Sequence, residues 1–183
     1  SGRRTSLARQ AWLRFALLRR KPRVDLVMSP GYRYALPGGL LDAERSTRIS
    51  SFLRRAGLTL RRRSHRPHPA SFAELRAAHD DDYLERLQHP GALTSVVGFA
   101  ISDRAEQELL AVQREMTGGT LLATRLARAW GGVAVNLGGG FHHAHRARGA
   151  GFCILNDVAV AIRAQRAQGF DRRVLVVDLD LHD

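Results

Sequence analysis

The feature that most constrains the fold of this chain is a pair of short motifs separated by one helix-length stretch. The first motif is GGGFHH at residues 138–143, a glycine turn followed at once by His142 and His143. The second is VLVVDLDLH at residues 174–182, an apolar run typical of buried parallel strands with alternating polar side chains after it. Together these patterns favour an α/β fold built on parallel strands.

The stretch between the motifs predicts one βαβ crossover. We expect Val133–Leu137 to be the strand that enters the glycine turn, Asp157–Gln168 to be the helix, and Val174–Asp178 to be the next strand. Such crossovers are nearly always right-handed, so both motifs should reach the same edge of the sheet. Ligands of open α/β sheets bind outside the carboxyl ends of the strands, and we therefore treat the two motifs as one site.

Three polar side chains project from the C-terminal end of the second strand at alternating positions: Asp178, Asp180 and His182. On a strand such residues lie on one face, and past its end two of them can turn onto one ion. Carboxylate and imidazole are ordinary zinc ligands, and a catalytic zinc site keeps one position open for water. Imidazole also titrates near neutral pH, which suits His142 and His143 to proton transfer. Each motif alone is more often structural, and the combination indicates a metal-dependent active site.

The two motifs, GGGFHHAHRARGAGFCILND and VLVVDLDLHD, together resemble the zinc-dependent histone deacetylase family, which shares the arginase/deacetylase fold. They are similar also to the acetylpolyamine amidohydrolases and acetoin-utilisation proteins of that superfamily, and residues 116–143 most resemble the class IV branch. The resemblance covers Val24–Asp183 and is sharp after Thr117. It implies a three-layer α/β fold with a mainly parallel sheet, incomplete at the C-terminus, that follows a basic helix or tail over residues 1–23.

The resemblance implies a role for each polar residue of the motifs. Asp180 and His182 would be zinc ligands, and His142 and His143 would be the general acid/base pair beside the metal. Asp178 would accept a hydrogen bond from His142, which fixes the tautomer of that imidazole. In the family the same aspartate also helps to hold a monovalent cation.

Three residues between the motifs are expected, again by resemblance, to shape the substrate pocket. Phe152 would line the tunnel that takes the acyl-lysine chain. Gly151 would leave room for that chain, and its carbonyl would accept a hydrogen bond from the substrate amide. Cys153 would lie near the acetyl group, or would simply be a buried small apolar residue.

The reaction implied is hydrolysis of an acetyl-amide, in an acetylated lysine peptide or an acetylpolyamine, to an amine and acetate. In the family a third zinc ligand and a tyrosine that stabilises the oxyanion come later than the position of Asp183. We therefore expect the natural chain to be longer, and these 183 residues alone to be inactive and poorly stable. The alternatives are a non-catalytic paralogue that binds acyl-lysine or a partner, and a less well matched arginase-like binuclear manganese hydrolase.

Composition limits the partners. The net charge of +12 and the pI near 11.4 favour an anionic partner. Lys21 is the one lysine, however, and the arginines are scattered along the chain, as in a GC-rich coding sequence, so nucleic acid is not expected as the main partner. No apolar run approaches the roughly 18 residues that span a bilayer, and a soluble, cytoplasmic protein is expected. A single cysteine excludes an internal disulfide, and the oligomeric state is left open.

The earlier part of the chain is also expected to alternate strands and helices. Ser1–Arg20 is basic and acid-free, and it fits an amphipathic helix on a membrane or partner, a transit peptide, or a solvated N-terminal helix. Tyr32 and Tyr34 are expected either to line the entrance of the site or to pack. Further expected elements are strands at 24–28 and 58–63 and helices at 43–55, at 72–78 with a Ser71/Glu74 capping box, after the aspartates 80–82, at 104–114 with Asp103 as cap, and at 121–129.

Overall fold

The fold is a small parallel sheet with helices on both sides, in a computed structural model that describes residues 24–34, 42–59 and 61–182. The basic segment 1–23 predicted from the sequence lies outside these residues. In the described part of the chain, no helix combines the length and the apolar character needed to cross a membrane.

Three parallel strands form the sheet, in the order β2-β1-β3. Strand β1 is Val24–Val27, β2 is Ser64–His65, and β3 is Val133–Asn136. In register, Val24 of β1 pairs with Val133 of β3, and Leu26 pairs with Ser64 of β2. The α/β class with a parallel sheet is therefore confirmed. The strand predicted at residues 58–63 is wrong, because three of these residues, Arg61–Arg63, form the 3₁₀ helix η2 and pairing begins only at Ser64.

One long helix, α6, spans Asp103–Trp130 and packs against both β1 and β3. The sequence predicts two helices here, with a break at residues 117–120, and that prediction is wrong. The glycines in the middle of α6 serve close packing instead of a break. A Cβ on Gly118 would lie 1.8 Å from the backbone oxygen of His68, and one on Gly119 would lie 2.0 Å from the Tyr32 hydroxyl. The N-cap is Ser102, whose hydroxyl accepts from the backbone N–H of Ala105, and not Asp103.

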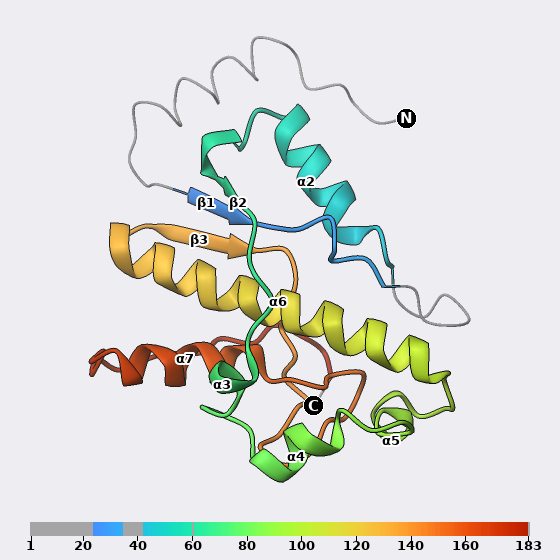
Figure 1. Ribbon diagram of the computed structural model, residues 1–183. Helices are drawn as coiled ribbons and strands as arrows, with labels where there is room; N and C mark the ends of the chain where they lie inside the picture. Colours follow the sequence, from blue (N-terminus) through green and yellow to red (C-terminus); the bar gives the residue numbers. More distant parts are fainter. Residues whose placement is uncertain (1–23, 35–41, 60, 183) are drawn as a thin grey trace.

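The helices are arranged in layers around this sheet (Figure 1). Helix α2 (Arg45–Arg55) lies on the side of the sheet away from α6, and α7 (Asp157–Ala167) packs on the far side of α6. The short helices α3 (Phe72–Leu75), α4 (Asp81–Arg86) and α5 (Thr94–Val97) complete that side. The predicted capping box at the start of α3 is present. The main core lies between helices α3 to α7 and the loop before α7. Its largest fully buried members are Leu75, Leu93, Leu121, Ile154, Leu155 and Val160.

The apolar run after α7 does not form the strand predicted at residues 174–178. Leu175 is 86% exposed and Val177 is 68% exposed, and the ladders of the described residues join β1 only to β2 and β3. A strand exists only through hydrogen bonds to a neighbour. The run carries the strand pattern in its sequence, but it has no ladder partner within the described part of the chain.

Candidate functional site

A polar cavity of about 550 Å³ opens at the carboxyl end of β3. Its walls come from α6, the glycine turn after β3, the loop before α7 and the segment at 180–182. Seven of the eight predicted site residues line it: His142, His143, Gly151, Phe152, Cys153, Asp180 and His182. The eighth, Asp178, contacts His142. The two motifs predicted to meet are thus brought together, even though the second is not in a strand.

The two histidines form a directly coupled pair. Their Nε2 atoms are 3.0 Å apart, and their rings meet edge to face at a centroid distance of 4.1 Å. The Nδ1 atom of His142 lies 3.2 Å from Oδ2 of Asp178. A neutral His142 that keeps its proton on Nδ1, toward this carboxylate, presents a bare Nε2. With that tautomer, the Nε2–H of His143 is the donor between the rings.

The predicted metal ligands lie beside this pair. Nδ1 of His182 is 2.7 Å from Oδ1 of Asp180, and the rings of His182 and His143 have centroids 6.4 Å apart. The segment is held by its own side chains, since the backbone N–H of Asp180 donates to Asp178 and that of His182 donates to Asp180. Hydrogen bonds from the backbone and the side chain of His182 lower the pKa of the Asp180 carboxyl.

The side chains of Asp180 and His182 are of types that commonly bind zinc. A carboxylate oxygen of Asp180 and an imidazole nitrogen of His182 lie next to each other in the lining of the cavity, and both are ordinary zinc donors. Among the described residues there is no group of three or more histidine, cysteine or acidic side chains arranged to hold a metal ion. The described residues therefore supply two donors of the correct type.

The residues expected to shape the pocket have unusual backbones. Gly151 has a φ of 51°, and a Cβ there would lie 2.5 Å from Cδ2 of His143. Phe152 is the one non-glycine residue in the described part of the chain with a positive φ, 64°. This left-handed conformation is costly for an aromatic residue and places Phe152 on the cavity wall. Cys153 is buried, and burial raises the pKa of its thiol, which keeps the sulfur neutral.

A glutamine of α6 fixes this strained loop. The amide nitrogen of Gln113 donates to the carbonyl of Phe152 at 2.6 Å, and its oxygen accepts from the backbone N–H of Ile154 at 2.8 Å. The N–H of Phe152 donates to the carbonyl of Val96 at 3.1 Å. Gln113 is itself buried, so two main-chain groups of the loop are satisfied in a place where water cannot replace the bonds.

Asp157, which the sequence pattern predicts only as the first residue of a helix, holds the glycine turn. Asp157 is 1% exposed, and its carboxylate accepts from the backbone N–H groups of Gly140 at 3.1 Å and Phe141 at 2.8 Å. The hydroxyl of Thr120 in α6 donates to it at 2.5 Å. A Cβ on Gly139 would lie 2.3 Å from the same carboxylate. The turn that carries the histidines is thus built around a buried charge.

The two tyrosines weighed from the sequence both line the cavity and both pack. The Tyr32 hydroxyl donates to Oδ1 of Asn136 at the end of β3, at 2.9 Å, and burial raises the pKa of the phenol. The Tyr34 hydroxyl donates to the carbonyl of Ala105, and burial raises its pKa as well. The sequence offers two alternatives for these tyrosines, lining the site or packing, and both apply.

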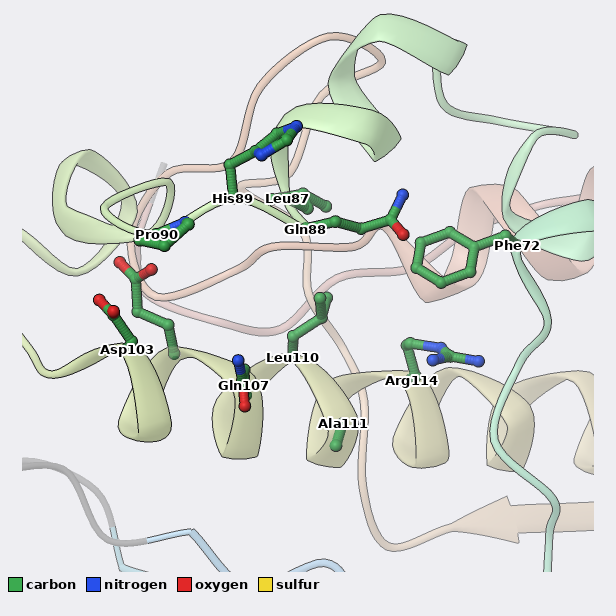
Figure 2. A pocket seen from close by; sticks show the side chains of 11 residues that line it. Phe72, Leu87, Gln88, His89, Pro90, Asp103, Gln107, Leu110, Ala111 and Arg114 are labelled. Carbon is green, nitrogen blue, oxygen red and sulfur yellow. The ribbon is translucent and has the colours of Figure 1, made fainter.

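A second, smaller cavity of about 270 Å³ lies between α6 and the segment that follows α4 (Figure 2). Gln107, Leu110 and Arg114 project from α6 toward it. Glu106, which also lines it, is buried and accepts from the backbone N–H groups of Gly91 and Leu93, so its carboxylate anchors a loop. This cavity has no coupled histidines, and the larger one remains the candidate active site.

Comparisons with known proteins identify a family and several relatives. The family model for the histone deacetylase domain matches residues 40–183. Histone deacetylase 2 of Arabidopsis thaliana is 30% identical over 171 residues, which are 87% of this chain and 43% of that protein. The acetoin utilization protein AcuC of Bacillus subtilis is 38% identical over 124 residues, which are 63% of this chain and 32% of that protein.

Solved structures give the same result for the fold. The crystal structure of an HDAC homolog from Aquifex aeolicus superposes with a TM-score of 0.65 at 25% identity, over 82% of this chain and 43% of that one. An HDAC homolog complexed with SAHA superposes with a TM-score of 0.64 over the same fractions. The chain spans less than half the length of these relatives.

Proposed function

The chain belongs to the histone deacetylase domain family and contains the N-terminal part of that domain, and from this premise we propose that the whole protein hydrolyses an acetyl-amide to an amine and acetate. The observation that carries the proposal is the coupled pair His142 and His143, with Asp178 behind it and Asp180 and His182 beside it, at one cavity. Relatives named as deacetylases support the same class of reaction.

Zinc is part of the proposal. Asp180 and His182 are the residues of this chain that would hold it, and zinc bound there would supply Lewis acidity that polarises the amide carbonyl and acidifies a water molecule. A monovalent cation near Asp178, expected from the resemblance, is likewise proposed.

The histidines would move the protons. The Asp178 carboxylate would accept the Nδ1–H of His142, which leaves Nε2 of His142 as the acceptor that faces Nε2 of His143. Nε2 of one ring would take a proton from the attacking water, and an Nε2–H of the pair would deliver a proton to the departing amine nitrogen. The 3.0 Å contact lets the rings share this proton between the two steps.

The proposed substrate is an acetylated lysine side chain in a peptide, or an acetylpolyamine. Phe152 offers an aromatic wall to an alkyl chain, and Gly151 keeps the space beside His143 open. Relatives named as histone deacetylases support the acetyl-lysine substrate, and the acetylpolyamine alternative comes from the sequence resemblance. Class IV membership, expected from residues 116–143, stays a prediction.

A non-catalytic protein that binds acyl-lysine or a partner is the second candidate. It is favoured by one observation, namely that the described residues offer two suitable zinc donors and no group of three. Such a protein would keep the cavity and the aromatic wall without turnover.

The test combines metal content and turnover, on the full-length natural protein. We expect about one zinc per chain and release of acetate from an acetyl-lysine peptide or acetylputrescine. Asp180→Ala should lose the metal, whereas His142→Ala should keep the metal and lose activity. Asp171→Ala, at an exposed position away from the cavity, is the matched control. Ligand binding without zinc or acetate release would favour the binding protein and overturn the enzyme.

A further inference from the structure

Residues 45–73, which share only Arg45 and Ser46 with the lining of the larger cavity, carry a high concentration of arginine. From Arg45 to Ala73 the chain contains no acidic residue, and its eight arginines occupy positions 45, 48, 54, 55, 61, 62, 63 and 66. All are exposed except Arg63, which is half-buried. Along the sequence the arginines are scattered, and this pattern alone does not predict a nucleic-acid partner. The fold gathers these eight on α2, on η2 and on the segment after β2.

These elements are neighbours in space. A tight turn ends α2, with the N–H of Gly57 bonded to the carbonyl of Arg54 and that of Leu58 to Leu53, and η2 follows within a few residues. In Figure 1 the end of α2 and the segment leading to β2 lie together at the outer side of the sheet, away from α6 and α7. The elements that carry these arginines are therefore adjacent, and we call their exposed arginines together the α2–η2 surface.

Most of this charge has no ion-pair partner among the described residues. Arg48 pairs with Asp42 at the start of α2, and Arg33 pairs with Glu44. Within the described part of the chain, the arginines at 54, 55, 61, 62, 63 and 66 have no ion-pair partner. Arg54 and Arg55 lie in the last turn of α2, where positive charge interacts favourably with the helix dipole. The helix dipole does not account for the arginines of η2 or for Arg66.

Two apolar side chains complete the surface. Phe52 is 58% exposed and Ile49 is 40% exposed, and both lie on the stripe of α2 that also carries Arg45, Arg48 and Arg55. The arginines along α2 extend over about 15 Å at 1.5 Å per residue. An extended row of cations with no interspersed acids matches a regular polyanion better than a compact acidic cluster.

We propose that the α2–η2 surface binds the phosphate backbone of double-stranded DNA without sequence preference. Guanidinium groups bind phosphate oxygens in bidentate fashion, and each bound phosphate releases counterions. A single exposed phenylalanine does not form the row of stacked aromatics that single strands require, and this favours the duplex. The inference is independent of the proposed hydrolysis.

The experiment measures the affinity of the full-length protein for a fluorescent duplex of random sequence at several salt concentrations. The test variant replaces four arginines of the surface by glutamine: Arg54, Arg55, Arg61 and Arg62. The control variant removes the same charge from exposed positions elsewhere: Arg104, Arg163, Arg172 and Arg173. We expect the test variant to bind at least about tenfold more weakly, with a salt slope smaller by about 0.9 for each phosphate that it no longer neutralises.

Each of the following results would either support or overturn DNA binding by the α2–η2 surface. Replacing the four test residues by lysine should restore most of the binding, because lysine keeps the charge, whereas loss caused by damaged folding would persist. Equal weakening of the control variant would show that net charge alone binds DNA and would overturn the proposal. Stronger binding to a single strand, or to polyglutamate, would assign the surface to a different partner. Deacetylation of a free acetyl-lysine peptide should not change in the test variant, so failure of either proposal leaves the other testable.

Discussion

The buried carboxylate of Asp157 offers a direct test of how the site is held. It accepts hydrogen bonds from the backbone of Gly140 and Phe141 and from the Thr120 hydroxyl, and it is 1% exposed. Gly140 is exposed, so water can replace its bond, but the other two donors are partly buried. A hydrogen bond to a charged group contributes about 1.5–3 kcal/mol, so Asp157→Ala should lower the free energy of unfolding by about 3–5 kcal/mol.

The same substitution should reduce catalysis more than substrate binding. Asp157 does not line the cavity, but the turn that it fixes carries His142 and His143. A displacement of about 1 Å in catalytic groups can cost about 100-fold in rate, so we expect kcat to fall by that factor with KM nearly unchanged. Asp157→Asn keeps the shape and one acceptor and should cost about 1–2 kcal/mol.

Urea unfolding followed by circular dichroism gives the stability, and steady-state deacetylation gives kcat and KM. Asp171→Ala removes an exposed aspartate and should change stability by less than about 0.5 kcal/mol. Wild-type stability and kcat in both Asp157 variants would refute the role of this carboxylate in organising the turn.

Three further predictions concern neighbouring parts of the site. Gly151→Ala should lower kcat at least about tenfold, because a Cβ at a φ of 51° would push the His143 ring, and wild-type kcat would contradict that close approach. Gln113→Leu should lower the free energy of unfolding by about 2–3 kcal/mol in urea titrations, because it leaves the buried N–H of Ile154 unpaired, and a decrease below about 0.5 kcal/mol would speak against the bridge. Burial lowers the pKa of His79, whose Nε2 accepts from a backbone N–H, so the unfolded state binds more protons and stability should fall as the pH drops below about 6.5. Urea titrations between pH 7 and 5 should show a shallower fall for His79→Gln, and equal slopes would exclude His79 as the cause.

How far the sequence predicts the fold depends on which interactions decide each element. Strand β1 and the capping box of α3 follow local patterns, and both are found. The glycines 118 and 119 have the local signature of a helix break, but tertiary packing against His68 and Tyr32 makes them part of α6. Local propensity is a weak guide where a close backbone approach needs a missing Cβ.

For the site, the sequence predicts which side chains meet and misses what supports them. His142 and Asp178 were expected to approach, and their nitrogen and oxygen are 3.2 Å apart. Asp157 and Gln113 carry no local signal of their roles, because an acidic residue in the first turn of a helix and a glutamine within one are both common. Only the fold shows that both are buried and bonded to the backbone of the loops around the cavity.

The exposure of residues 174–182 gives the two walls of the cavity different local stabilities. The amide of Phe141 donates to a buried carboxylate and should exchange its hydrogen only when the core around α6 and α7 opens. The amides of Asp180 and His182 are bonded only to side chains within their own exposed segment, so they should exchange through local opening at a far lower free energy. Any ion or substrate that binds across the cavity would order the second wall against the first. Slower exchange at residues 178–182, with no change at Phe141, would therefore be the earliest sign that the site has been filled.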